Sequence, residues 1–586
     1  RGVQRAYRPH LYATSAAAAA RGQMERAWPA VLEATVGTVG TDAWLQGRDG
    51  AASAAGSAAM AAPDGGDGGG ALTQPIVARP DTEDFALLLG LCVHRLAEEA
   101  ASPSDGGGGG GGAHGDDETL QCIGALQRLL LPGRYFAPAA LPPPSLLAML
   151  QLLESLAAAP HCSPGVRDAI AGLSSHVCAH LGPYVRSSAD GGGASFGGMP
   201  PMAAELLAAA QRMCAAPALR AYPHLAQPQQ LGSPASVPPP APLAAADVRS
   251  VMLAVRGLAA LPSALEPGST QRLGWVPTPL LVTLYVAHAA ANANAASPSP
   301  ATSAELAAEA QAALKALLAL VPTEPREAAS WAPLLLSAGE TALALAAATP
   351  AARRLPLLQL LLELASALPE GAAGGEFGGD SLHAKAQQAV RELLGGADVA
   401  GQRVGLQALQ ALLSAAAAPG APPSVASCAQ GFVTALAPDV APLLLRSVPP
   451  AATDKAAALK VLLLACSIAP PPMLPTLLSL ALPLMIGCMW VAAEGAADAA
   501  TLELSKLAHA SVTALAKRAT AEFKQAVAVF DPAVKARMET AIRDNAAAAA
   551  QPVAAAGGGT PGRGAGTPAA KPSIALKMDF SSFGKK

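Results

Sequence analysis

Aromatic and charged residues are both scarce in this chain of 586 residues, at 3% and 14% of the sequence respectively. The usual charged fraction is about 25%. The formal net charge of -3 reflects no excess of Lys and Arg. A surface that binds nucleic acid normally appears as a basic stripe. We therefore expect no nucleic-acid partner.

Closely paired cysteines are also lacking, which argues against a structural zinc site. The eight cysteines stand singly in apolar segments, as expected for buried free thiols in a reducing compartment. On a helix His176 and His180 would share a face while Cys178 points away, so we prefer two partly exposed histidines beside a buried thiol to a metal site. The densest group of metal-type ligands comprises His161, Cys162, His176, Cys178 and His180.

Catalytic and nucleotide-binding signals are missing as well. The tract Gly106–Gly112 fits GxGxxG only because it is entirely glycine, and no GKS or GKT follows to form a phosphate-binding loop. Stacked helices seldom build the converging polar pocket that catalysis requires. We expect no enzymatic activity, no cofactor and no bound metal.

Low-complexity segments divide the chain, because Gly-rich and Pro/Ser-rich stretches cannot bury enough apolar surface to become ordered. We expect helical repeats with Gly-rich insertions at 81–226 and a helical array at 246–548. The remaining parts are a poorly ordered or partly helical segment at 1–80, a Pro/Ser-rich linker at 227–245, a disordered linker at 549–572 and a C-terminal peptide at 573–586.

Leucine spacing in the apolar segments indicates amphipathic helices. In 353–368 five leucines recur at helical spacing, while Glu363 and Ser366 lie on the opposite side, and 402–415 repeats the scheme. We expect Thr453 with Asp454 to cap the helix that carries Leu459 to Leu464, and Asp531 to cap a helix that begins at Pro532. No segment shows sustained alternation with a period of two, so a sheet is not expected. The sequence therefore predicts an all-α, HEAT- or armadillo-like solenoid of antiparallel helix pairs, with about 40 residues per pair.

One uncharged stretch, 461–493, allows two interpretations. Prolines at 470–472, 475 and 483 interrupt it, whereas a membrane span needs about 20 continuous apolar residues. A transmembrane helix at 473–493 would just suffice. The preferred interpretation is a buried helical hairpin that turns at the three prolines.

The last residues form an apolar alternating peptide after the predicted linker. Such a peptide can fold back onto the final helices, bind a partner or stay disordered, and all three possibilities stay open. Phe580 and Phe583 also resemble the Phe-x-x-Phe peptides that adaptor ear domains capture. The candidate partner-binding residues are Ile574, Leu576, Met578, Phe580 and Phe583.

The segment Ser573–Phe580, with the preceding helix Pro532–Glu539, resembles the C-terminal region of the HEAT-repeat-containing protein 5 family. That family includes the plant Sweetie-type proteins and the yeast clathrin-adaptor accessory protein. The segments Asp84–Cys92 and Cys122–Leu130 are compatible with it. Long Gly/Pro insertions and the added residues 581–586 depart from the family pattern.

The resemblance implies a large cytosolic HEAT protein of which this chain, beginning at Arg1, would be the C-terminal part. Its expected role is a non-enzymatic scaffold that binds clathrin adaptor subunits or accessory proteins. It would act in vesicle transport among the trans-Golgi network, endosomes and plasma membrane, attached to membranes through partners. The alternatives are a membrane-anchored protein and a generic HEAT scaffold of a signalling complex.

Overall fold

The computed structural model describes twelve segments of the chain: 82–101, 112–130, 136–139, 141–159, 162–190, 199–226, 245–266, 270–293, 300–368, 381–445, 452–490 and 499–550. Every element in these segments is helical, and the fold is all-α and HEAT/armadillo-like, as the sequence predicts. The low-complexity tracts at 63–70, 191–198 and 227–242 lie outside the described residues.

The chain forms two compact units, the first comprising residues 1–350 and 356–373 and the second residues 351–355 and 374–586. The first contains α4 (Thr82–Ala101), α5 (Gly112–Leu129), α6 (Pro143–Ala158), α7 (Pro164–Ala179), α8 (Gly182–Asp190), α9 (Pro201–Ala221), α10 (Ala245–Ala260), α11 (Thr270–Leu273), α12 (Pro277–Ala293), α13 (Pro300–Leu318), α14 (Pro325–Ala348) and α15 (Leu355–Ser366). The second contains α16 (Leu382–Gly395), α17 (Val399–Ala417), α18 (Pro423–Leu445), α19 (Ala452–Ile468), α20 (Leu474–Trp490), α21 (Ala499–Arg518), α22 (Thr520–Val529) and α23 (Pro532–Ala550).

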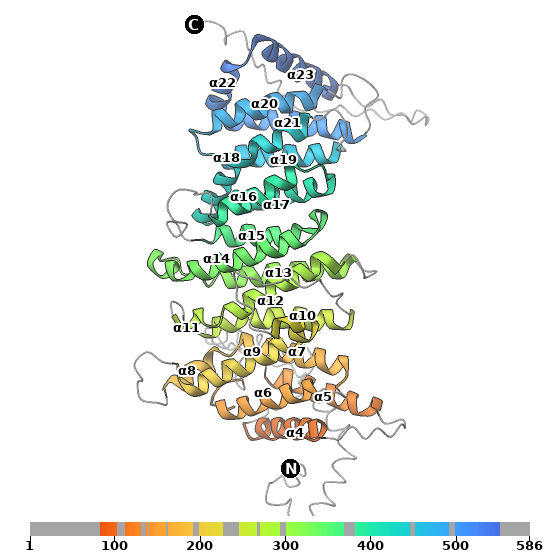
Figure 1. The fold of residues 1–586 in the computed structure, drawn as a ribbon, viewed down its shortest axis with the longest axis vertical. Coiled ribbons are helices and arrows are strands. Elements are labelled where there is room, and N and C mark those ends of the chain that lie inside the picture. Colours follow the sequence, from red (N-terminus) through yellow and green to blue (C-terminus); the bar gives the residue numbers. More distant parts are fainter. Residues whose placement is uncertain are drawn as a thin grey trace, which may run out of the picture. The chain divides into compact units, whose positions relative to one another are not determined.

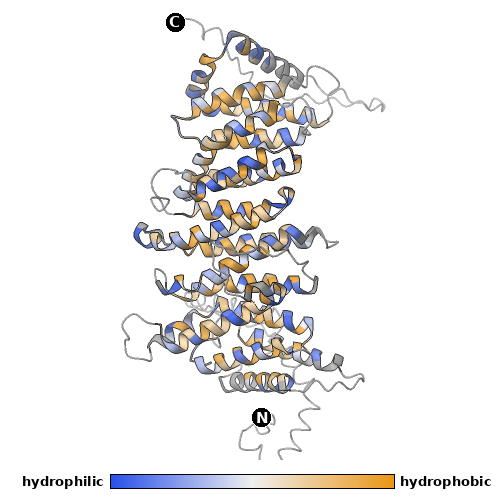
Figure 2. Cartoon of the chain, in the orientation of Figure 1, coloured by the Kyte–Doolittle hydropathy of each residue, from blue (hydrophilic) through white to orange (hydrophobic). Residues whose placement is uncertain are grey.

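Packing within each unit follows the repeat pattern. In the second unit α17 packs on α19, α18 on α20 and α19 on α21, so the helices from α16 to α22 contact their second neighbours along the chain as well as their first (Figure 1). Proline opens many of the helices, because its missing N–H is unpaired in a first turn anyway. Hydrophobic positions run along the helices and polar ones gather at ends and outer turns (Figure 2).

In the first unit the packing is closest where α7, α9 and α10 meet. A Cβ placed on Gly257 would lie 2.7 Å from Cys214 Sγ and 2.9 Å from Ser175 Cα, so only glycine fits there without displacement. Cys178 Sγ and Cys214 Sγ lie 3.2 Å apart, and both thiols are buried. Buried free thiols are what the scattered cysteines predict.

Two expectations about polar side chains prove wrong, one about Ser366 and one about Asp454. The leucines of α15 are buried as predicted, but Ser366 is also buried, and its hydroxyl donates to the Leu362 carbonyl at 2.7 Å. A serine can be buried in a helix in this way because its hydroxyl bonds to the preceding turn. Asp454 does not cap α19, which already begins at Ala452, but Asp531 does cap α23, accepting from the Ala533 N–H at 2.8 Å.

The described part of the uncharged stretch, residues 461–490, forms the predicted hairpin. α19 ends at Ile468, residues 469–473 turn, and α20 begins at Leu474 and packs against α18, α21, α22 and α23. Among the residues that the structure describes, three other helical segments are long and apolar enough to cross a membrane by length and composition alone: Gln271–Asn292, Arg326–Ala348 and Pro423–Leu445. Between 50% and 67% of each is buried within the chain.

Candidate functional site: an apolar groove between α18 and α20

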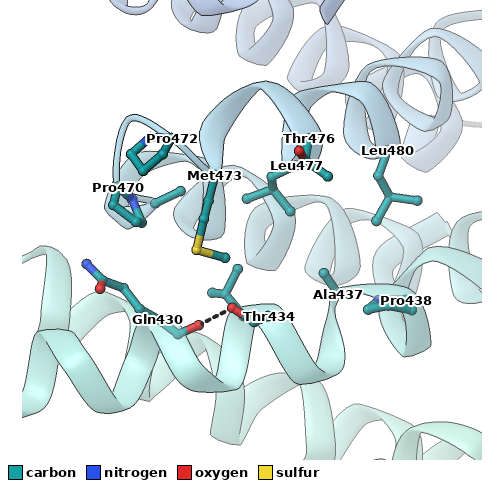
Figure 3. A pocket seen from close by; sticks show the side chains of 12 residues that line it. Gln430, Thr434, Ala437, Pro438, Pro470, Pro472, Met473, Thr476, Leu477 and Leu480 are labelled. Atoms are coloured by element: carbon teal, nitrogen blue, oxygen red, sulfur yellow. Dashed lines mark hydrogen bonds between the residues drawn. The ribbon is translucent and has the colours of Figure 1, made fainter.

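A groove of about 280 Å³ lies in the second unit, between α18 and the turn that leads into α20 (Figure 3). Met473 points from the turn toward α18, and Leu477 and Leu480 follow it along α20. The residues that line the groove are Gln430, Val433, Thr434, Ala437, Pro438, Ala469, Pro470, Pro472, Met473, Thr476, Leu477 and Leu480.

Prolines shape both walls of this groove. Pro470 and Pro472 lie in the turn between α19 and α20, and neither can donate a backbone hydrogen bond to prolong α19. On the opposite wall Pro438 lies inside α18 and has no N–H to offer the Thr434 carbonyl four residues earlier. The Thr434 carbonyl therefore lacks its usual helical partner, on the helix that forms one wall of the groove.

The chemistry of the lining favours binding over catalysis. It contains no Asp, Glu, His, Lys, Arg or Cys, so no lining side chain can serve as a general base, an anion site or a thiolate nucleophile. The Thr434 hydroxyl donates to the Gln430 carbonyl within its own helix at 2.9 Å. What the groove offers a ligand is apolar contact, together with a few polar atoms that can orient it.

Hydrogen bonds hold α18 in place on both sides. Arg391 of α16 donates from Nε to Asp439 Oδ2 and from Nη2 to the Ala435 carbonyl, each at 3.0 Å. On the groove side the Gln430 side chain donates to the Ile468 carbonyl at 3.3 Å, which ties α18 to the end of α19. The backbone that forms the groove is therefore fixed from two directions.

An ion pair that sequence reasoning missed links α17 to α19. Arg403 donates to both carboxylate oxygens of Asp454, at 2.5 and 3.0 Å, and the Asp454 side chain is mostly buried. Arg518 of α21 donates to the Ser467 carbonyl at 3.0 Å. The Arg403–Asp454 and Arg391–Asp439 pairs join residues 51 and 48 positions apart in the chain, so no local sequence signal marks them.

The candidate partner-binding residues of the C-terminal peptide lie outside the described residues, so their role stays a prediction. They are Ile574, Leu576, Met578, Phe580 and Phe583.

The histidines and cysteines of α7 are arranged as the helical spacing predicts. His176 and His180 lie on one face with ring centroids 4.8 Å apart, while Cys178 lies against Cys214. His176 Nε2 is 2.7 Å from the Leu130 carbonyl oxygen. Burial and the nearby His176 lower the pKa of His180. His161 lies outside the described residues, and the described part of the chain shows no group of three or more metal-type ligands.

Comparison with protein families identifies the region around the groove. A family model described as "LAA1-like, C-terminal TPR repeats" matches residues 383–554. These residues are LAA1-like repeats. The LAA1-like region contains the groove and the helix Pro532–Glu539 on which the resemblance partly rested. The terminal peptide and the segments before residue 383 fall outside the match.

Helix spacing in the LAA1-like region is longer than a tetratricopeptide repeat. α16 begins at Leu382 and α18 at Pro423, so one helix pair takes about 40 residues. A tetratricopeptide repeat takes about 34 residues and a HEAT repeat about 40 to 47. The geometry is therefore HEAT-like, although the family description names TPR repeats.

The other comparisons add no relative of known role. The search among curated proteins found no match. Among solved structures, a chain of the "Crystal complex of SYS-1/POP-1 at 2.5A resolution" is 11% identical, and the alignment covers 81% of this chain and 88% of that one. Its TM-score is 0.23.

Proposed function

We propose that this chain is a non-enzymatic scaffold in clathrin-adaptor-dependent vesicle transport. The observation that carries the proposal is the LAA1-like region at 383–554, since LAA1 is the yeast clathrin-adaptor accessory protein. The chain would work in the cytoplasm, at the surface of the trans-Golgi network, endosomes or vesicles. Its attachment to those membranes would run through protein partners.

The groove supports a scaffold role because it can bind but has no groups for catalysis. Its lining is apolar, and it is built on helices fixed by inter-helix hydrogen bonds. A rigid apolar recess of this kind suits the side chains of a peptide, and repeat proteins commonly bind partners along such surfaces. No cofactor is required for this role.

The C-terminal peptide supplies a second element of the proposal. Phe580 and Phe583 are spaced as in the Phe-x-x-Phe peptides that adaptor ear domains capture, and we propose that they bind such a domain. Each phenylalanine would contribute apolar burial of about 2 kcal/mol. Two such anchors supply about 4 kcal/mol, roughly half of the ~8 kcal/mol that binding at 1 μM requires, so the other contacts of the peptide with the ear domain must supply the rest.

The test is a titration of purified clathrin adaptor complex, and of its isolated ear domain, against the full chain. We expect micromolar binding to the ear, and replacing Phe580 and Phe583 with Ala should abolish that binding. Replacing Ser581 and Ser582 with Ala is the matched control and should leave it unchanged. If the full chain binds neither the complete adaptor nor its ear, the trafficking proposal is wrong.

A membrane-anchored protein is the second candidate, favoured by the three helical segments with the length and composition of a membrane span. Carbonate extraction of membranes from cells that express the chain separates the two candidates. A peripheral scaffold is released into the supernatant, whereas a spanning protein stays with the pellet. Since half or more of each segment is buried in the fold, we expect release.

A further inference from the structure

The groove between α18 and α20 leaves apolar side chains partly uncovered. Met473 and Leu480 are only half-buried, while Val433 and Leu477 are buried beneath them. Covering apolar surface of this kind releases about 25 cal/mol for each Å² removed from water. The groove is therefore a place where a short apolar segment gains free energy by docking.

The size of the groove limits what can occupy it. Its volume of about 280 Å³ is nearly twice the ~150 Å³ of a cavity that holds one benzene molecule. The wall from Gln430 to Pro438 rises along α18 by roughly 12 Å, at about 1.5 Å per residue. An extended peptide covers that length in about four residue steps, at about 3.3 Å each. The fitting ligand is an extended peptide with two or three aliphatic side chains on one face.

The sequence of this chain contains such a peptide. Ile574, Leu576 and Met578 occupy every second position, so in an extended conformation their side chains share one face. The distance from the first to the third is four residue steps. Ala575 and Lys577 fall on the opposite face. The length and the number of apolar side chains match those of the groove.

The connection to this peptide begins on a helix that packs against the groove wall. α23 ends at Ala550 and packs on α20, with Met538 fully buried. Residues 551–573 then separate α23 from Ile574, and 23 residues can span up to about 75 Å. α20 itself is only about 25 Å long, so every part of the groove is within reach.

The covalent linker favours the chain's own C-terminal peptide over a separate peptide that competes for the groove. A peptide joined by a short flexible linker experiences an effective concentration of about 1 mM. If the same peptide binds with a Kd of about 10 μM, the tethered copy fills the groove almost completely. A partner in the cell at micromolar concentration would have to displace it.

We propose that Ile574, Leu576 and Met578 dock as an extended peptide into the groove between α18 and α20 of the same chain. The Thr434 carbonyl, which lacks the helical N–H that Pro438 cannot supply, is an acceptor for a backbone N–H of the docked peptide. The docked tail closes the groove to other apolar peptides. The proposal is independent of the trafficking function, since it concerns two parts of one chain.

The first experiment measures amide hydrogen exchange in the full chain. Peptides that cover 430–438 and 473–480 should exchange at least tenfold more slowly in the full chain than in a variant that lacks residues 551–586. Leu576→Asp should abolish this difference, whereas Ala575→Asp, which places the same charge on the other face, should retain most of it. Equal exchange with and without the tail overturns the proposal.

The second experiment titrates a fluorescent peptide of residues 571–586 against the tail-deleted chain. We expect micromolar binding there and at least tenfold weaker binding to the full chain, whose groove is already filled. Thr434→Arg places a long charged side chain at the exposed edge of the groove and should abolish binding. Thr520→Arg is the matched control, because Thr520 is equally exposed and its hydroxyl bonds to the preceding turn at 2.9 Å, as that of Thr434 does.

Three results of these experiments count against the proposal. The peptide can fail to bind the tail-deleted chain, it can bind equally well after Thr434→Arg, or it can bind the full chain as tightly as the deleted one. Protection that grows with protein concentration would show docking into a second copy and also overturn docking within one chain. None of these results bears on adaptor binding by Phe580 and Phe583, which is measured separately.

Discussion

The two units use similar alanine- and leucine-rich helices but pack them differently. In the first, α7, α9 and α10 approach so closely that Gly257 has no room for a Cβ. In the second, α18 and α20 leave a groove, and Gly487 of α20 has nothing within 4 Å of an added Cβ. Composition alone therefore does not set the closeness of packing. The closeness of packing depends on where glycine and proline lie relative to the contacts between helices.

Charged side chains also differ between the units. In the first, burial raises the pKa of the carboxyls of Asp168 and Glu363, so it disfavours their charged form. In the second, Asp439 and Asp454 at helix contacts each face an arginine, at 3.0 and 2.5 Å. Burial therefore disfavours the charge on these two carboxyls of the first unit, whereas each of the two carboxyls of the second unit is held by an arginine.

The largest expected effect is on the free energy of unfolding, which should change in opposite directions when two helical glycines, Gly257 and Gly487, are replaced by alanine. Gly257→Ala should destabilise the protein by about 2 kcal/mol, since overpacking costs about 1–3 kcal/mol and outweighs the gain in helix propensity. Gly487→Ala should stabilise it by about 0.5–1 kcal/mol, because the new methyl meets nothing. Urea unfolding followed by circular dichroism measures both.

Two further variants separate packing from propensity. Gly124→Ala in α5 is the control within the first unit, since its added Cβ meets nothing within 4 Å and it should behave like Gly487→Ala. Cys214→Ala combined with Gly257→Ala removes the sulfur contact but keeps the clash with Ser175, and should recover only part of the loss. A stabilising Gly257→Ala would mean that the helices separate freely and that the contrast between the units is not one of packing.

Much of the fold follows from the sequence, because leucine spacing and helix-opening prolines are local signals. The buried leucines of α15 and the proline turn between α19 and α20 are examples. The partners of polar groups could not be predicted, since they depend on which helices stack. Asp454 was expected to be a cap and instead pairs with Arg403. The groove has no sequence signal of its own, because it arises from the distance between two helices.

The second prediction concerns Glu363, which accepts from Gln311 Nε2 at 2.9 Å and lies 3.5 Å from Lys315 Nζ. Burial raises the pKa of Glu363 in the folded protein above its unfolded value. Its contribution to stability is therefore fully present below the unfolded value of about 4.3 and is lost as pH rises through the folded pKa.

Glu363→Gln should accordingly stabilise the protein at pH 7.5, by less than about 1 kcal/mol, with a smaller difference at pH 5. Thermal unfolding at the two pH values measures this change. Glu305→Gln, at an exposed position of α13, controls for the loss of a surface charge. A variant that is less stable than the wild type mainly at pH 7.5 would show that attraction to Lys315 outweighs the cost of burial.

The smallest expected effect is that of the surface ion pair which holds α18. Arg391→Ala removes the bond to Asp439 and the bond to the Ala435 carbonyl, but both charged side chains are partly exposed, at 41% and 31%. Water weakens such pairs, so we expect a loss of only about 0.5–1 kcal/mol. A double-mutant cycle with Asp439→Asn isolates the ion pair, and hydrogen exchange at 430–438 reports its effect on the groove. A loss above about 2 kcal/mol would show that this pair carries as much of the packing in the second unit as the contacts around Gly257 carry in the first.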